Sequence, residues 1–323
     1  MTTLRILFMG TAELSCASLA ALAAGEQFRV AAVVTRPDKP KGRDLQLQAS
    51  PVKTLALKLG LPVLQPVRAR DEQFVAEIRG LKPDLIVVVA YGQILPPAIL
   101  DLPPHGCLNV HTSLLPKYRG AAPIQWAVAN GDPETGVSIM KMDAGLDTGP
   151  IIAQSRTAIL PADDSATLHD RLAQLGADLL VRTIPDYVSG TVQPVPQPSE
   201  GASYAAKIKK EDGRIDWQLP AQTILNRLRA FTPWPGAFTF LDGKLLKIWK
   251  ARFAKEILHP EVSLVEQGLK PGTILAADKT GIFVACGKDF VRVRELQREG
   301  GKRLTAEQFL AGHPLNPGSQ LLG

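Results

Sequence analysis

The residues best suited to chemistry in this 323-residue chain are Asn109 and His111, two positions apart at the end of a short apolar run. Residues 107–110 are β-prone, and a strand there would place both side chains on one face at its carboxyl end. An amide and an imidazole could then donate hydrogen bonds to one carbonyl oxygen, where negative charge develops in a tetrahedral intermediate. The pair predicts a site for acyl transfer.

A carboxylate close to His111 would fix the tautomer of the imidazole and favour its charged form. The loop after residue 142 offers two candidates, Asp143 and Asp147. Its glycines argue against a regular helix, so the spacing does not choose between the two acids. The chain has no Gly-x-Ser-x-Gly motif, and Ser113 lies too close along the chain to His111 to form a nucleophile–base pair. We therefore expect direct attack by an amine of the substrate.

Sites for metals and nicotinamide cofactors are disfavoured. The turn after the first apolar run contains only Gly10 where a dinucleotide fingerprint needs three glycines, and no calcium-loop pattern is present. The cysteines Cys16, Cys107 and Cys286 lie far apart and form no Cys-x-x-Cys pair. They indicate a reducing compartment and incidental thiols rather than a zinc site. We expect no metal.

The elements that would position these residues alternate between apolar strands and helical patterns, which is typical of an α/β fold with a mostly parallel sheet. The expected strands are 4–9, 29–35, 62–64, 85–90, 108–111, 136–142 and 151–154, and the expected helices are 15–24, 51–59, 71–80, 123–130 and 165–187. Ligands of such sheets bind beyond the carboxyl ends of the strands. We therefore expect one crevice lined by Gly10, Thr35, Tyr91 and His111.

Residues 35–50 are charged and interrupted by prolines and a glycine, so we expect a surface loop beside the crevice rather than a packed element. Its basic side chains could meet phosphates, although a mobile solvated loop explains them equally well.

Residues 189–206 are rich in Ser, Gly, Pro and Gln and are interpreted as a linker between domains 1–188 and 207–323. Beyond it, one helix is expected at 222–231, followed by short strands with Gly-containing turns at 238–241, 245–251, 272–276, 281–285 and 290–296. This pattern predicts a small antiparallel β-barrel.

The basic excess lies entirely in the C-terminal third. Residues 1–205 carry 18 Lys and Arg against 19 Asp and Glu, whereas residues 206–323 carry 19 against 12. Such asymmetry suggests contact with a polyanion, with a solvated basic surface as the alternative. Glu13 interrupts the N-terminal apolar run, and no later stretch is apolar enough to span a bilayer, so we expect a cytoplasmic protein without a membrane partner.

With these residues in view, the chain resembles the methionyl-tRNA formyltransferase family over nearly its full length. The motifs that carry the resemblance are VTRPDKPKGR at 34–43, SPVK at 50–53, AYGQILP at 90–96, NVHTSLLPKYRGAAPIQ at 109–125 and LDTGP at 146–150. The resemblance implies a Rossmann-like formyltransferase domain followed by an oligonucleotide-binding (OB) type barrel. It also implies transfer of a formyl group from 10-formyltetrahydrofolate to the amine of methionyl initiator tRNA, in translation initiation.

The resemblance also assigns roles to residues. The family's catalytic residues match Asn109, His111 and Asp147, which selects Asp147 from the two acids. The aminoacyl amine would attack the formyl carbon while Asn109 and protonated His111 hold the oxyanion, and Asp147 would orient His111 and assist proton removal through water. The folate contacts fall on Ser113, Leu114, Leu115 and Pro116, with the pterin towards Ile94 and Leu95. Arg43 matches an arginine of the loop that engages tRNA.

Two other functions stay open at this point. A related formyltransferase could act on an amino-sugar nucleotide, or the chain could be a tRNA-binding module whose α/β domain is catalytically silent. The basic barrel domain favours tRNA over the sugar nucleotide, and the grouping of Asn109, His111 and Asp147 favours an enzyme over a binding module. We expect the enzyme to act as a monomer.

Overall fold

The computed structural model describes residues 3–41, 46–254 and 269–323. By its internal contacts the chain divides into two compact units. The first comprises residues 1–123, 134–158 and 168–205, and the second comprises 124–133, 159–167 and 206–323. The first unit therefore contains Asn109, His111 and Asp147 together.

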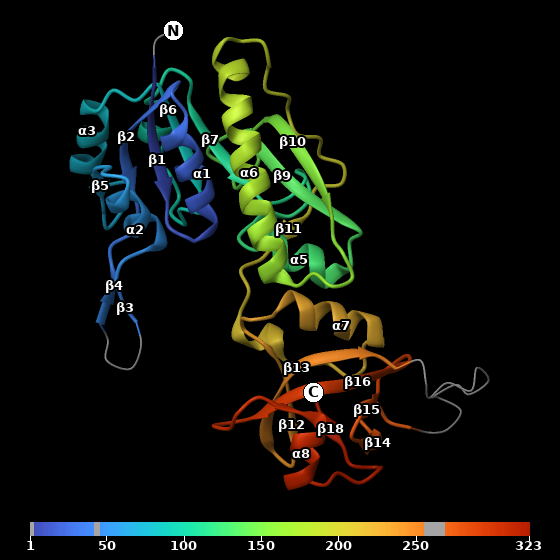
Figure 1. Ribbon diagram of the computed structural model, residues 1–323. Helices are drawn as coiled ribbons and strands as arrows, with labels where there is room; N and C mark the ends of the chain where they lie inside the picture. The colour runs from blue at the N-terminus through green and yellow to red at the C-terminus, as the bar shows by residue number, and fades with distance from the viewer. Residues whose placement is uncertain (1–2, 42–45, 255–268) are drawn as a thin grey trace. The chain divides into compact units, whose positions relative to one another are not determined.

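A seven-stranded sheet forms the centre of the first unit (Figure 1). Its order is β10-β9-β7-β6-β1-β2-β5, in which β7, β6, β1, β2 and β5 run parallel while β9 and β10 run antiparallel. The strands are β1 (Leu4–Gly10), β2 (Phe28–Val34), β5 (Val63–Leu64), β6 (Leu85–Val89), β7 (Cys107–His111), β9 (Glu134–Lys141) and β10 (Ile151–Ala158). This confirms the predicted mostly parallel sheet.

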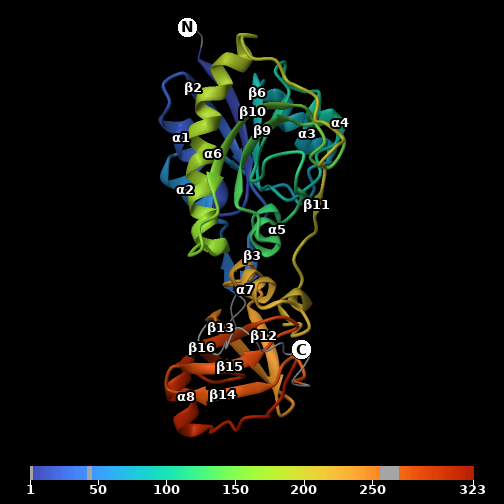
Figure 2. The ribbon, with the colours of Figure 1, turned by 90° about the vertical axis from the view of Figure 1, so that its right-hand side faces the viewer.

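Helices cover both faces of this sheet, which explains why its central strands are apolar throughout. On one face, Leu7 and Met9 of β1 pack with Phe74 and Ile78 of α3. Figure 2 shows α3 and α4 on that face and α1, α2 and α6 on the other. The helices are α1 (Leu14–Ala24), α2 (Pro51–Lys58), α3 (Glu72–Gly80), α4 (Pro97–Leu100) and α6 (Ser165–Val188). None of the described helices combines the length and apolar character needed to cross a membrane.

The interpretation of residues 35–50 as a loop without packed structure is wrong in part. β3 (Lys39–Lys41) and β4 (Gln46–Gln48) pair as a short antiparallel hairpin, with Pro40 opposite Leu47. Backbone pairing needs no apolar pattern, and a proline is tolerated in a strand whose amide side faces no partner. Arg43 lies outside the described residues.

The predicted linker, residues 189–206, follows the first unit closely. Val195 forms an isolated bridge with Ile151, and β11 (Tyr204–Ala205) pairs in parallel with β8 (Arg119–Gly120). We call residues 193–205 the strap. By its contacts, the strap belongs to the first unit.

The second unit is built on a strongly bent antiparallel sheet with the order β14-β15-β16-β13-β12-β18, and β17 pairs with β16. Register shifts in the long β13–β16 pair interrupt the ladder, and such bulges increase twist and curl a sheet. The strands are β12 (Ala237–Leu241), β13 (Lys244–Phe253), β14 (Ile274–Asp278), β15 (Gly281–Ala285), β16 (Phe290–Arg298), β17 (Leu304–Thr305) and β18 (Leu321–Leu322). The predicted barrel-type domain after the α/β domain is confirmed.

The helices of the second unit close its core. Trp217, Ile224, Leu228 and Phe309 are buried against the inner side chains of β13 to β16. The helical elements are α5 (Pro123–Asn130), η1 (Lys210–Gly213), α7 (Ala221–Ala230) and α8 (Ala306–Gly312). The sequence pattern predicted α5 and α7 but not the short α8.

Candidate active site

Asn109 and His111 lie on one face of β7 at its carboxyl end, as strand alternation requires. β7 is an internal strand, because β6 pairs with it in parallel and β9 pairs with it antiparallel. Asn109 is half-buried, and the His111 side chain is only 6% exposed. Both side chains therefore start from a backbone that is held on both sides.

Asp147 completes a polar cluster with these two residues. Asn109 Nδ2 donates to Asp147 Oδ1 at 3.2 Å, and His111 Nδ1 lies 3.7 Å from Asp147 Oδ2. The backbone N–H of Gly120 also donates to Oδ2, at 2.9 Å. We call Asn109, His111 and Asp147 the candidate cluster. An amide, an imidazole and a carboxylate are thus gathered at one sheet edge.

The other acid of the loop faces a different set of partners. Asp143 Oδ1 accepts hydrogen bonds from Gly145 N at 3.0 Å and from Thr148 Oγ1 at 2.8 Å. These contacts close the loop on itself, and Asp143 is exposed. Of the two acids that the sequence left open, Asp147 is the one beside His111.

The second ring nitrogen of His111 fixes how the ring can act. Nε2 lies 2.9 Å from the backbone carbonyl oxygen of Tyr118. A carbonyl only accepts hydrogen bonds, so Nε2 carries a hydrogen. In the neutral ring Nδ1 is then an acceptor, and in the charged ring Nδ1–H points to the carboxylate side. The distance of 3.7 Å between Nδ1 and Asp147 Oδ2 is longer than that of a direct hydrogen bond, so the ring could still move relative to the carboxylate.

Two family models cover most of the chain. The model described as formyl transferase matches residues 4–184, and that of the formyl transferase C-terminal domain matches residues 207–314. A methionyl-tRNA formyltransferase of Myxococcus xanthus is 54% identical over 316 residues, which covers 98% of this chain and 97% of the relative. Another, of Citrifermentans bemidjiense, is 50% identical over 321 residues and covers 99% and 97%. The chain belongs to the methionyl-tRNA formyltransferase family.

A solved structure supports the fold of this family member. The sugar 3N-formyl transferase WlaRD, crystallised in the presence of dTDP and 5-N-formyl-THF, superposes with a TM-score of 0.65. The two chains are 17% identical, and the match covers 91% of this chain and 98% of that one. The two chains therefore share a fold, while the family resemblance found in the sequence motifs is confirmed by the curated relatives.

In this methionyl-tRNA formyltransferase family member, the turn predicted to contact folate, Ser113–Pro116, is rigidly held. Ser138 Oγ donates to the Ser113 carbonyl at 2.7 Å and accepts from Leu115 N at 3.0 Å. Gln154 Nε2 donates to the Leu115 carbonyl at 2.9 Å. The side chains of Ser113 and Leu115 are buried, and those of the other two are partly exposed. A ligand would therefore meet Leu114 and Pro116 rather than all four side chains.

The two residues expected near a pterin differ sharply in exposure. Ile94 is 87% exposed, whereas Leu95 is 4% exposed and packs in the core with Ile99. An exposed isoleucine costs free energy in water, about 25 cal/mol per Å² of apolar surface. Ile94 is therefore exposed enough to meet an apolar ligand surface, whereas Leu95 belongs to the core.

One cavity of the first unit has a lining that contains none of the residues expected to line the crevice, Gly10, Thr35, Tyr91 and His111. Thr11 Oγ1 donates to the Tyr91 carbonyl at 3.1 Å, which joins the chain after β1 to the chain after β6. The cavity, of about 630 Å³, opens here, lined by Thr11 and Arg36 among others but not by His111. Tyr91 is 1% exposed, and burial raises the pKa of its hydroxyl to about 12. Its side chain belongs to the core, so its expected place in the crevice is wrong.

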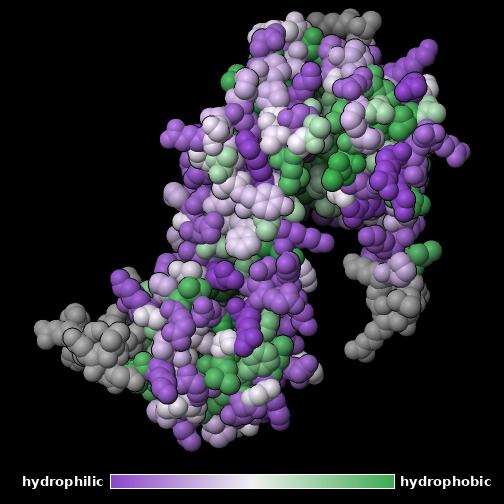
Figure 3. Space-filling view, turned by 180° about the vertical axis from the view of Figure 1, so that it is seen from behind, coloured by the Kyte–Doolittle hydropathy of each residue, from purple (hydrophilic) through white to green (hydrophobic). Residues whose placement is uncertain are grey.

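The second unit carries a basic cavity of about 630 Å³ beside β13 and β16. Hydrophilic residues cover most of the second unit on the face seen in Figure 3. The charged residues that line the cavity are Asp164, Arg229, Lys250, Arg252, Lys279, Arg294, Glu295, Arg303 and Glu307. Glu295 pairs with Lys250 and Arg303, each at 2.6 Å. Arg252, Lys279 and Arg294 form no ion pair with any described residue.

Trp249 adds an aromatic surface to the same cavity. Lys247 Nζ lies 5.7 Å from the centroid of its ring, and Arg303 Cζ lies 5.0 Å from it. These cation–π contacts hold positive charge next to an apolar face. Basic groups interleaved with an aromatic ring are typical of surfaces that bind nucleic acid.

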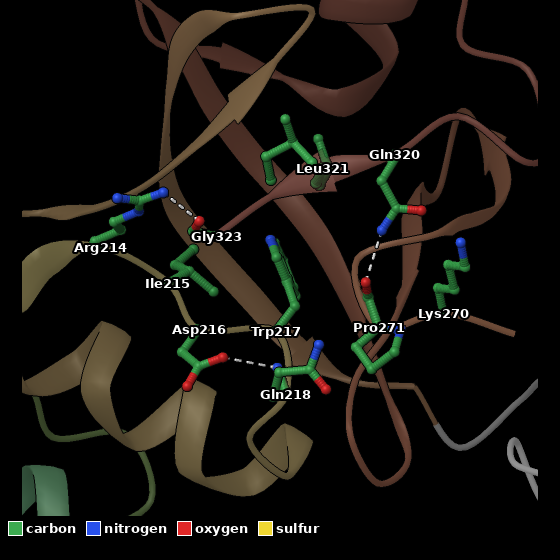
Figure 4. A pocket seen from close by; sticks show the side chains of 11 residues that line it. Arg214, Ile215, Asp216, Trp217, Gln218, Lys270, Pro271, Gln320, Leu321 and Gly323 are labelled. Carbon is green, nitrogen blue, oxygen red and sulfur yellow. Dashed lines mark hydrogen bonds between the residues drawn. The ribbon is translucent and has the colours of Figure 1, made fainter.

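Another cavity of the second unit has a volume of about 740 Å³ and is lined by residues 214–218, 270–271 and 320–323. Some of its polar groups bond to one another, as Figure 4 shows for Arg214, which donates to the Gly323 carbonyl. Gln320 Nε2 likewise donates to the Pro271 carbonyl, at 2.6 Å. The side chains of Lys270 and Gln218, which belong to the same lining, form no hydrogen bond in that view.

Sequence reasoning missed the residues that serve the candidate cluster through their backbone. Tyr118 supplies the carbonyl that binds His111, and Gly120 supplies the N–H that binds Asp147. Both lie within the motif at 109–125, which is the only signal that could have pointed to them. Gln197 of the strap bonds to the backbone of Asp147 and had no sequence signal at all.

Proposed function

We propose that this chain transfers the formyl group of 10-formyltetrahydrofolate to the amino group of methionyl initiator tRNA, in the cytoplasm, at the start of translation. A relative with that enzyme name matches the chain at 54% identity over 98% of its length. The observation that carries the proposal is the candidate cluster, in which Asn109 Nδ2 and His111 Nδ1 both face the carboxylate of Asp147.

The reaction exchanges one carbon–nitrogen bond for another. The amine of the methionyl group bonds to the formyl carbon, the bond from that carbon to N10 of the folate breaks, and one proton moves from the amine to N10. Negative charge develops on the formyl oxygen in the tetrahedral intermediate. Donors already in place for that oxygen lower the barrier, and losing one donor typically costs about 10²–10³ in rate.

Asn109 and His111 would supply those donors. Asn109 Nδ2 has two N–H groups and uses one on Asp147 Oδ1, so the other is available to substrate. Because Nε2 of His111 is committed to the Tyr118 carbonyl, the charged ring would donate through Nδ1. Asp147 would stabilise that charged ring and receive the amine proton through water. The three side chains then act as one unit.

The folate would lie against Ile94, Leu114 and Pro116, which offer exposed or partly exposed apolar surface in the first unit. Because hydrogen bonds already fix the backbone of the turn at 113–116, the turn would not have to rearrange when folate binds. Preorganisation of this kind lowers the entropy cost of binding.

The tRNA would be bound through charge. Arg252, Lys279 and Arg294 of the basic cavity would contact phosphates, and Trp249 would offer a stacking surface. Arg43, matched by motif alone, would engage the acceptor end. This assignment accounts for the basic excess of residues 206–323, with 19 basic against 12 acidic residues.

A formylation assay with three acceptors tests the proposal directly. We expect methionyl initiator tRNA to be formylated in preference to methionyl elongator tRNA, and no transfer to an amino-sugar nucleotide. Transfer to the sugar nucleotide alone would replace our assignment with the rival acceptor. A protein that binds tRNA but gives no heat when titrated with a folate analogue would instead be a binding module.

A further inference from the structure

Gln197 of the strap is the point where several contacts around the candidate cluster meet. Its Nε2 donates to the backbone carbonyls of Asp147, at 2.8 Å, and Gly149, at 2.7 Å. Its Oε1 accepts from Arg119 Nε at 3.0 Å and Nη2 at 2.9 Å. Two donors and two acceptor sites are the whole capacity of a side-chain amide, so every one is used. A surface glutamine in a solvated segment rarely has this many protein partners.

Gln197 contacts two groups, and each of them affects the position of the Asp147 carboxylate. On one side, Gln197 fixes the backbone of Asp147, whose φ of 53° is one that side chains with a Cβ seldom adopt. On the other side, it fixes Arg119, whose neighbour Gly120 donates the N–H that Asp147 Oδ2 accepts. One amide thus links the acid to the element that supplies its hydrogen-bond donor.

The strap itself is suited to presenting Gln197 in one position. Pro196 and Pro198 flank it, and each proline restricts its own backbone dihedral and that of the residue before it. Val195 is fixed to Ile151 by a two-way backbone bridge, and Ser203 Oγ accepts from Tyr118 N at 2.9 Å. The strap is therefore attached on both sides of Gln197.

We propose that Gln197 is a positioning residue of this enzyme: by clamping the backbone of Asp147 and Gly149 to Arg119, it holds the Asp147 carboxylate at Asn109 and His111. The inference rests on the proposed function, since it assigns Gln197 a role in formyl transfer. It places a kinetic function on a segment that the sequence indicates only as a linker.

Two variants test the clamp. Gln197→Ala removes all four hydrogen bonds, and Gln197→Glu keeps an acceptor for Arg119 but turns an acceptor towards the two carbonyls. We expect each to lower kcat for formylation at least about tenfold, because misplacement of a reacting group by an ångström can cost ~10²-fold. The KM values for folate and tRNA should stay within about threefold of those of the parent protein, since Gln197 contacts the loop that contains Asp147 rather than a ligand.

The matched control is Gln193→Ala. Gln193 belongs to the same strap and is exposed, and within the described part of the chain its side chain donates only to the nearby Gly190 carbonyl, at 2.9 Å. We expect its kcat to stay within about twofold of the parent protein. A kcat for Gln197→Ala as high as that of this control would overturn the proposal.

A double-mutant cycle separates positioning from a general structural role. If Gln197 acts through the carboxylate, Gln197→Ala should lower kcat by less than about twofold once Asp147 is already Asn, because the two losses share one cause. Losses that multiply in the double variant would show that Gln197 acts independently of Asp147 and would overturn the proposal.

Hydrogen exchange tests the clamp without any activity. Amides of residues 143–152 should exchange at least about tenfold faster in Gln197→Ala than in the parent or in Gln193→Ala, because local opening is set by the contacts that hold the loop. If the parent protein formylated no tRNA, the proposed function would be wrong. Hydrogen exchange would still show whether Gln197 holds the loop in place. Unchanged exchange would refute the clamp even in a fully active enzyme.

Discussion

His111 Nε2 lies 2.9 Å from the backbone carbonyl oxygen of Tyr118, and this single contact determines which ring nitrogen faces the chemistry. The carbonyl keeps a hydrogen on Nε2, so only Nδ1 can gain or lose a proton beside Asp147. Asp147 Oδ2 lies on that side, 3.7 Å away. Any role of His111 in formyl transfer therefore passes through Nδ1.

Replacing His111 by Ala should lower kcat by about 10²–10³, the usual cost of losing one donor to a developing oxyanion. Folate affinity, measured by isothermal titration, should change less than about threefold, since the ring is not among the expected folate contacts. His169→Ala is the control, because His169 lies on α6 and pairs with Asp170. Unchanged turnover in His111→Ala would exclude the ring from the mechanism.

The two acids of the loop should respond very differently to amidation. Asp147→Asn removes the negative charge beside His111 and should reduce kcat at least about 10²-fold. Asp143→Asn leaves that contact untouched, because among the described residues Asp143 bonds within its own loop, to Gly145 and Thr148. Single-turnover rates would separate the two. Equal losses in both variants would mean that loop shape, and not the Asp147 charge, limits the reaction.

Removing a phosphate contact should weaken tRNA binding and its dependence on salt together. Arg252→Ala and Arg294→Ala should each reduce the slope of log K against log salt by about 1. Arg156→Ala in the first unit is the control, since Arg156 is 66% exposed, pairs with Glu134 and is not part of the cavity lining. Filter binding at several salt concentrations measures the slope. An unaltered slope for the cavity variants would place the tRNA elsewhere.

The thiols should be unreactive near neutral pH. Burial raises the pKa of Cys107 and of Cys286 to about 12, and burial with the nearby Glu13 raises that of Cys16 to about 11. A raised pKa means that the reactive thiolate forms only at more alkaline pH, so about one thiol in 10³ or fewer is ionised at pH 8. Iodoacetamide labelling read by mass spectrometry should modify Cys107 and Cys286 only after unfolding. Rapid labelling of Cys107 in the folded protein would contradict its burial.

The parts of the fold that the sequence predicted are those with a strong local pattern. Apolar runs such as Leu85–Val89 could only be strands buried on both faces, and alternation alone placed Asn109 beside His111 on β7. The choice of Asp147 needed the family motif, because its loop has no period from which to infer a direction. The loop sequence supplied the two candidates, and the family motif decided between them.

What the sequence could not predict depends on contacts between distant residues. Gln197 bonds to Asp147 across 50 positions and to Arg119 across 78, and nothing in a Pro-rich segment indicates such partners. The β3–β4 hairpin escaped for a related reason, because its pairing depends on backbone hydrogen bonds and not on an apolar pattern. Tyr91 was misplaced because a position at a strand end does not tell whether the side chain turns inward.

The attachment of the strap decides where the chain can be cut. A fragment that stops at Val188, the last residue of α6, would lack Val195, Gln197 and Ser203. The loop that contains Asp147 would then lose the contacts that the strap makes with it. A fragment extended through Ala205 would keep them all. A fragment of the α/β half made for crystallography or inhibitor screening should therefore include the strap, because the strap contacts the loop that contains Asp147 and does not merely connect two domains.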